Sequence, residues 1–396
     1  MTTRSILRGG LQRSALVVFG LVLAFALAEG GLRIAGRLQG LDYRLYLREL
    51  KNSRVIPFEI WQDPEGGDFE GMVMRARRRY PPFRPGALEV ATTSDFSVLY
   101  RVNSRGLRDA EHSFAREPGR ARYLAIGDSF TFGSGLDYGE RFSEVAERSF
   151  DDLEIVNMGV PGYGLDDVLL SYIEVGARYR PDAVVVILNR QVVRRHFTGI
   201  YDRGEVRIGD ADRAAPVAEA GDAETVFLAR NDPLFQQSPC WVRSSYLLSY
   251  ASYRVQIFRL QQRLRAQDAE FWAHALRARE PENIVSDAHP ARRERAIALL
   301  GALRDRANAD GVRVIVVNID DGQRWEFLAD IPGIVYHDLS EPLHRRGREQ
   351  PLRFRFDRHY NAATNAFIGR ALAEILHADR AAADEAGNPP EAPHPQ

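Results

Sequence analysis

Four short apolar runs, separated by stretches of helical periodicity, constrain the fold of this chain more than any other feature. The runs cover residues 123–126, 153–156, 183–188 and 312–319. Their largely apolar character suits strands buried on both faces, as in a parallel sheet covered by helices. Apolar residues recur at helical spacing over 296–307, just before the last run. The alternation predicts an α/β domain built on a parallel sheet.

The N-terminus carries a segment suited to a membrane. Residues 14–28 hold no charged side chain. They follow Arg4, Arg8 and Arg13, the charge asymmetry of a segment whose N-terminus stays in the cytoplasm. The run is shorter than the ~20 residues of a comfortable span, and residues 26–28 fit a signal-peptidase site that would release a soluble periplasmic protein by cleavage near Ala28.

Apolar character resumes over 30–35, so a retained inner-membrane anchor is favoured over cleavage. Both interpretations place the rest of the chain in the periplasm. A buried helix of a cytosolic protein is disfavoured, because the flanking arginines lack helical periodicity.

The rest of the chain divides into regions of different composition. We expect an anchor or signal over 1–38, a spacer or accessory region over 39–118, an α/β domain over 119–378 and a disordered tail over 379–396. Residues 197–290 interrupt the domain and are too long for an ordinary connection. Apolar residues at helical spacing between 247 and 264 predict an amphipathic helix there, packed on the core in preference to a membrane or a partner helix.

Charge and cysteine content exclude several classes of partner. The 53 basic and 54 acidic residues give a net charge of −1, so no global field gathers nucleic acid. The single cysteine, Cys240, permits neither an intrachain disulfide nor a thiolate zinc site. No metal, no cofactor and no nucleic-acid partner is expected.

A serine lies directly after the first apolar run, in the sequence Gly127-Asp128-Ser129-Phe130. Neighbouring glycines let the backbone turn tightly and leave amides free to face an anion, as a nucleophile with an oxyanion site requires. A serine nucleophile also needs a base and an orienting carboxylate. The sequence Asp357-Arg358-His359, just before a helix expected over 361–376, provides both.

These motifs resemble the SGNH, or GDSL-type, serine hydrolase superfamily over roughly 120–378, with the insertion set aside. The resemblance implies a flavodoxin-like three-layer α/β/α fold, with Ser129 as nucleophile and Asp128 in a supporting role. It makes His359 the base and Asp357 its orienting acid. It needs no cofactor.

Two further segments extend the resemblance. Residues 157–164, after the second run, resemble the family's second block and make Gly162 the implied oxyanion donor. Residues 103–109 resemble a segment that precedes the nucleophile in membrane-anchored bacterial members.

The third family block departs from the pattern. Members usually carry Gly-x-Asn-Asp after the third strand, whereas this chain reads Asn189-Arg190-Gln191-Val192. Counting without gaps puts Gln191 at the oxyanion position, while chemistry alone favours Asn189. Shared strand parity would let either amide face the site, and both could also be polar caps of a strand. A poor substitute would cost on the order of 2.7 to 4 kcal/mol of transition-state stabilisation.

The leading functional hypothesis is an exported serine esterase. It would act through an acyl-enzyme on carboxylic esters, O-acetyl esters included, of a small molecule, an envelope polysaccharide or a lipid. An O-acyltransferase that passes the acyl group to a sugar hydroxyl is the second hypothesis. A non-catalytic envelope scaffold or binding protein with a degraded oxyanion hole is the third.

Overall fold

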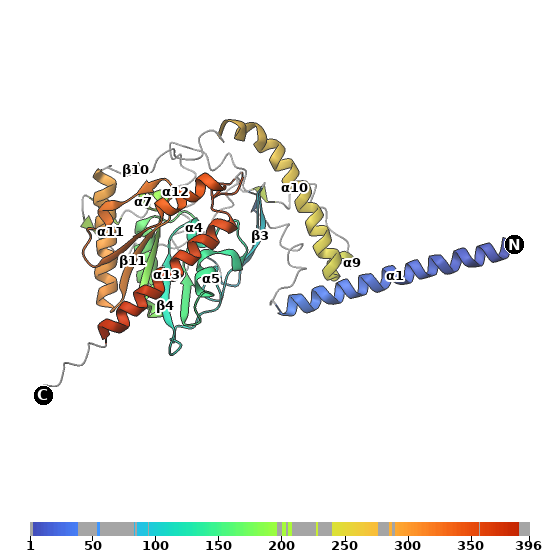
Figure 1. The fold of residues 1–396 in the computed structure, drawn as a ribbon, viewed down its shortest axis with the longest axis horizontal. Helices are drawn as coiled ribbons and strands as arrows, with labels where there is room; N and C mark the ends of the chain where they lie inside the picture. The colour runs from blue at the N-terminus through green and yellow to red at the C-terminus, as the bar shows by residue number, and fades with distance from the viewer. Residues whose placement is uncertain are drawn as a thin grey trace.

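The computed structural model describes residues 3–38, 54–55, 83, 85–93, 95–195, 200–202, 205–207, 227–228, 240–275, 285–286, 290–355 and 357–387. The stretch 388–396 of the expected tail lies outside the described residues. Figure 1 shows a sheet domain with a long N-terminal helix that extends away from it.

A five-stranded parallel sheet forms the centre of the domain. Its strands are β4 (Ala121–Ile126), β5 (Leu153–Asn157), β6 (Ala183–Leu188), β11 (Arg313–Asn318) and β13 (Ile334–Asp338). They lie in the order β13-β11-β6-β4-β5, and every neighbouring pair is parallel. Numbered along the chain this is the order 2-1-3-4-5, the flavodoxin-like arrangement. The predicted fold class is confirmed.

The burial of each strand explains whether it could be predicted from the sequence. Every residue of β4, β5 and β6 is buried, and β11 is buried except at its first residue. These are the four predicted runs. The fifth strand, β13, escaped prediction because it lies at the sheet edge, is mostly half-buried or exposed, and ends in His337 and Asp338.

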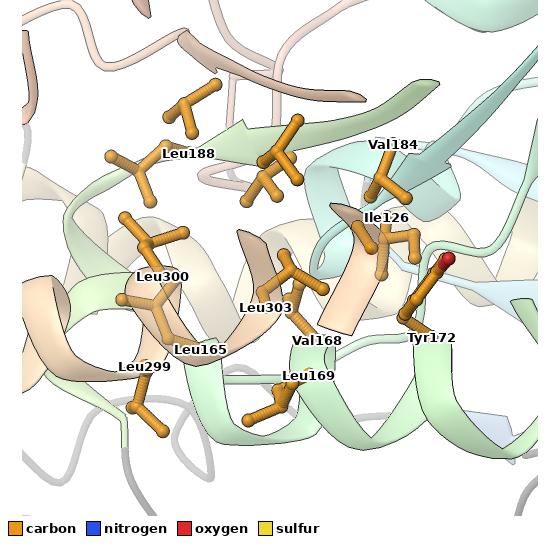
Figure 2. Close-up of a cluster of buried hydrophobic side chains, with 14 of the residues drawn as sticks. Ile126, Leu165, Val168, Leu169, Tyr172, Val184, Leu188, Leu299, Leu300 and Leu303 are labelled. Carbon is orange, nitrogen blue, oxygen red and sulfur yellow. The ribbon is translucent and has the colours of Figure 1, made fainter. Parts of the chain in front are cut away.

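Two helical layers cover the sheet. On one face, α6 (Leu165–Glu174) and α11 (Pro290–Ala309) pack against Ile126, Val184 and Leu188. In Figure 2, side chains of both helices, such as Leu300 and Val168, lie between the helices and the strands. On the other face lie α5 (Phe142–Glu147), α12 (Ser340–Glu349) and α13 (Ala362–Gly387).

A second, four-stranded sheet lies beside the domain, in the order β3-β2-β1-β9. Its strands are β1 (Arg54–Val55), β2 (Leu88–Thr92), β3 (Ser97–Arg101) and β9 (Phe227–Leu228). The helix expected inside the insertion is present as α10 (Tyr246–Ala275), preceded by α9 (Cys240–Ser244). Tyr253 and Ile257 of α10 pack against Val90 and Leu99 of β2 and β3.

The N-terminal helix α1 spans Thr3–Leu38. Its stretch Ser14–Leu38 is long and apolar enough to cross a membrane, and the most apolar 18-residue window has no buried residue. Such a helix suits either a membrane anchor or a signal sequence.

Short elements complete the described chain. They are α4 (Ser129–Phe132), η2 (Tyr138–Glu140), η3 (Gly176–Tyr179), α7 (Arg190–Arg194), β7 (Tyr201–Asp202), β8 (Glu205–Val206), β10 (Val285–Ser286), β12 (Gln323–Arg324) and η6 (Glu326–Leu328).

Two expected boundaries differ from the structure. Within the expected spacer 39–118, Arg108 and Asp109 are buried and bonded to the α/β domain, so the packed unit begins before residue 119. The tail was expected from 379, but α13 continues to Gly387. Asp379 accepts hydrogen bonds from Arg313 at 2.9 Å and from the Tyr123 hydroxyl at 3.1 Å, which ties this last part of the helix to the sheet.

Candidate active site

Ser129 lies in a tight turn, residues 127–133, at the carboxyl end of β4. It is the first residue of α4, and the side chain of the preceding Asp128 accepts the Phe130 N–H at 3.0 Å. A Cβ on Gly127 would lie 2.3 Å from Thr131 Oγ1 and 2.9 Å from the carbonyl oxygen of Ile187. Only glycine fits there, which accounts for the Gly-Asp-Ser sequence in structural terms.

Ser129, His359 and Asp357 form one hydrogen-bonded chain. Nε2 of His359 lies 2.7 Å from Oγ of Ser129, and Nδ1 lies 2.6 Å from Oδ1 of Asp357. The same Asp357 oxygen accepts the backbone N–H of His359 at 2.8 Å. The structure thus brings together the three predicted site residues, although Ser129 and His359 lie 230 positions apart in the sequence.

The loop that carries His359 is held by aromatic packing and by a residue that sequence reasoning missed. The ring of Phe130 lies 5.2 Å from the His359 ring and 4.9 Å from that of Tyr360. Asp95, in the turn between β2 and β3, accepts the backbone N–H of Asp357 at 2.7 Å. No sequence motif marks Asp95, because its partner lies 262 positions away.

Asn189, not Gln191, contacts the Ser129 turn. Asn189 is buried at the end of β6, and its Nδ2 donates to Oδ1 of Asp128 at 3.0 Å. Its Oδ1 caps α7 by accepting the N–H groups of Gln191 at 2.8 Å and Val192 at 3.2 Å. The expectation of shared strand parity was wrong, because β6 ends at Leu188 and Gln191 already lies in the helix.

Arg190, the first residue of α7, bonds to a residue at the end of the neighbouring strand. Its Nη2 and Nε bind the two carboxylate oxygens of Asp320 at 2.6 and 2.9 Å, and its backbone N–H donates to the same carboxylate at 2.8 Å. Burial works against ionisation of Asp320, but these contacts hold its pKa below the ordinary value. The altered third block therefore fastens the start of α7 to the loop after β11.

The loop after β5 packs against the Ser129 turn. The Val160 N–H donates to the Gly127 carbonyl at 3.0 Å, and a Cβ on Gly159 would lie 2.2 Å from the backbone nitrogen of Phe132. Gly162 follows with φ +87°, a left-handed conformation that favours glycine. The implied oxyanion residue thus belongs to a loop in contact with α4.

A buried arginine supports the other end of α4. Arg108 donates to the carbonyl oxygens of Phe132 at 2.6 Å, Gly133 at 2.8 Å and Leu136 at 2.5 Å. Burial lowers the pKa of this guanidinium to about 10. The segment 103–109 therefore has a structural role, because it holds the end of the helix that begins at Ser129.

A charged cluster lies next to this arginine. Asp109 pairs with Arg141 at 2.9 Å and with His112 at 3.1 Å, and His112 also meets Glu154 at 2.9 Å. Burial alone would lower the pKa of His112, but the two carboxylates raise it to about 10. Within the ranges that the structure describes, no cluster of His, Cys, Asp and Glu could hold a metal ion.

The Ser129 turn and Asn189 lie at the point where the strand order reverses. The chain passes from β4 outward to β5, and then returns to β6 on the other side of β4. Ligands of open α/β sheets bind at the carboxyl ends of strands at such a switch point. The site therefore stands where this sheet topology favours a ligand.

No family model and no curated protein matches the sequence. A lipolytic protein of the G-D-S-L family from Desulfitobacterium hafniense DCB-2 is similar over 65% of this chain and 100% of its own, with 12% identity and a TM-score of 0.30.

Two other solved structures are similar at the same level. A G-D-S-L family member from Veillonella parvula DSM 2008 covers 65% of this chain and 98% of its own, with 11% identity and a TM-score of 0.33. A carbohydrate acetylesterase family member from Sinorhizobium meliloti covers 65% and 97%, with 14% identity and a TM-score of 0.26. Similarity this low does not establish an activity.

Proposed function

We propose that this protein is a serine hydrolase of carboxylic esters that works through an acyl-enzyme on Ser129. The observation that carries the proposal is the hydrogen-bonded chain from Ser129 Oγ through His359 to Asp357. A serine hydroxyl becomes a useful nucleophile when a base of this kind removes its proton.

The distances support a two-step reaction. As Ser129 Oγ attacks the acyl carbon, Nε2 of His359 takes the hydroxyl proton, and Asp357 stabilises the imidazolium through Nδ1–H. Nε2 then gives the proton to the leaving alcohol oxygen as the C–O bond breaks. Water resolves the acyl-enzyme by the same steps in reverse, which releases the acid and restores Ser129.

Three donors would stabilise the oxyanion. They are the backbone N–H of Ser129 at the start of α4, the N–H of Gly162 and Nδ2 of Asn189. One hydrogen of that amide is given to Asp128, and we assign the second to the oxyanion. Its contact with the Ser129 turn favours Asn189 over Gln191 for this role.

We also propose that α1 anchors the chain in the inner membrane with the α/β domain in the periplasm. The apolar stretch Ser14–Leu38, whose most apolar window has no buried residue, and the arginines before it support this orientation. Esters of envelope polysaccharide or lipid, O-acetyl esters included, are then the substrates within reach.

A fluorophosphonate probe tests the proposal. The purified full chain should be labelled, Ser129→Ala should not, and Ser113→Ala, at an exposed serine outside the site, should be labelled like the wild type. An unlabelled wild type would contradict the proposal and favour the non-catalytic scaffold. Acetate release with and without oligosaccharide acceptors then separates hydrolysis from acyl transfer.

A further inference from the structure

The helix α10 has one face packed on the protein and one face turned outward. Its inner residue Tyr253 is buried, and its hydroxyl lies 2.9 Å from Ser97 Oγ of β3. On the outer face, Val255 is 50% and Phe258 61% exposed, and Trp241 of the preceding α9 is 66% exposed. Three large apolar side chains exposed to water on two consecutive helices are unfavourable unless something covers them.

The same outer face is basic. Arg254 and Arg259 are exposed beside Val255 and Phe258. From Tyr246 to Gln267 the sequence holds four arginines and no acidic residue. A helix that combines exposed apolar and basic side chains is typical of the surface of an anionic membrane.

The start of α10 is fastened to α1. Glu29 of α1 accepts hydrogen bonds from the N–H groups of Tyr246 at 3.0 Å and Leu247 at 2.8 Å, and from the Ser245 hydroxyl at 2.8 Å. Arg33, one turn further along α1, pairs with Glu29 at 2.7 Å. Glu29 thus caps α10 together with Ser245, the local N-cap residue, whose hydroxyl accepts the Leu248 N–H at 3.1 Å.

This cap fixes where α10 lies along α1. Glu29 is the first charged residue after the run 14–28, so it stands near the periplasmic interface of a membrane-spanning α1. Figure 1 shows α9 and α10 beginning beside the C-terminal half of α1. The outer face of α9 and α10 therefore begins at the level of the membrane surface.

We propose that Trp241, Arg254, Val255, Phe258 and Arg259 form a docking face that lies in the headgroup region of the bilayer that α1 spans. Tryptophan favours that region, and arginine there pairs with anionic lipid. The inference rests on the anchoring part of the proposed function and is independent of the chemistry at Ser129. Contact at both α1 and α10 fixes the orientation of the domain toward the membrane.

Single-cysteine variants of the full chain test the docking face. In a Cys240→Ser background, spin labels at Phe258→Cys, Leu21→Cys and Val335→Cys are compared in vesicles of phosphatidylethanolamine and phosphatidylglycerol. Leu21, 67% exposed on α1, reports the lipid core, and Val335, 46% exposed on β13, reports water. Collision with oxygen marks lipid, and collision with a water-soluble nickel chelate marks water.

We expect the Phe258 label to fall between the other two, with oxygen access well above that at Val335. A lipid-exposed Leu21 label with a Phe258 label as water-accessible as Val335 overturns the docking face and leaves the anchor standing. A water-accessible Leu21 label overturns both. A Phe258 label that neither reagent reaches would be covered by protein, and this result would also overturn the docking face.

Charge reversal provides the second measurement. The double change Arg254→Glu and Arg259→Glu should reduce oxygen access at the Phe258 label in phosphatidylglycerol vesicles, and an unchanged signal would overturn the charge complementarity. If the Phe258 label is water-accessible on vesicles but is immobilised by a soluble anionic polysaccharide, the docking face binds that polymer and the membrane proposal is overturned.

Discussion

At the scale of single residues, Ser129, Asp357 and His359 could be found from sequence because each stands in a short local pattern. Ser129 follows a buried strand in a turn that only glycine permits, and Asp357 lies two positions before His359. The choice between Asn189 and Gln191 could not be made this way. It depends on where β6 ends, and that end is set by the helix cap that Asn189 itself supplies.

Substitution of Asn189 should therefore cost more than substitution of Gln191. We expect Asn189→Ala to lower kcat by roughly 10²-fold or more with KM little changed, since one oxyanion donor is lost. Asn189→Ser keeps a capping oxygen for α7 but no amide donor, so it should regain stability without regaining kcat. Steady-state kinetics and thermal melts of these variants, with Gln191→Ala as control, measure both. A larger loss in Gln191→Ala would reverse the assignment.

At the scale of elements, burial decides what sequence can reveal. The strands β4, β5, β6 and β11 could be recognised in the sequence because both of their faces are buried. The end of α13 was misjudged because apolar periodicity fades after Leu376. The segment after Leu376 is rich in alanine, which has high helix propensity. Together with the contacts of Asp379 with the sheet, this propensity extends the helix to Gly387.

The hairpin of β2 and β3 should matter for catalysis through Asp95, which holds the Asp357 loop. We expect Asp95→Ala to lower kcat several-fold with KM little changed, because the chain from Asp357 to His359 loosens. Asp95→Asn keeps an acceptor oxygen for the Asp357 N–H and should restore most of the rate. If Asp95→Ala turns over esters at the wild-type rate, the hairpin does not position the site.

The buried cluster around His112 predicts a pH dependence of stability. The folded-state pKa of His112 is raised from 6.5 to about 10, so its contribution is complete below pH 6.5 and is lost as the pH rises toward 10. The free energy of unfolding of the wild type should fall over this range more steeply than that of His112→Gln. Denaturant unfolding at a series of pH values measures the two slopes, and equal slopes would contradict a charged His112.

At the scale of the whole molecule, the described contacts link the N-terminal helix to the site. Glu29 of α1 holds the start of α10, Tyr253 of α10 bonds to β3, and Asp95 beside β3 bonds to the Asp357 loop. Sequence could indicate the apolar segment and the amphipathic helix separately. It could not show that they meet, because the joining contacts span more than 200 positions.

The cap that Glu29 provides should be separable from catalysis. We expect Glu29→Ala to speed hydrogen exchange at the amides of Tyr246 and Leu247, which lose their acceptor. Turnover of the soluble ester p-nitrophenyl acetate should stay at the wild-type rate, because no part of this contact touches Ser129. Unchanged exchange at these two amides would mean that α1 does not hold α10 in solution.

The identity of the nucleophile is tested most directly by trapping the acyl-enzyme. After brief reaction with p-nitrophenyl acetate and acid quench, mass spectrometry of the digested full chain should find an acetyl group on the peptide that contains Ser129. His359→Ala should accumulate far less of it, since Ser129 Oγ loses its base. Absence of the acetyl group from the wild type, or equal acetylation of Ser129→Ala at another residue, would contradict a serine hydrolase built on Ser129.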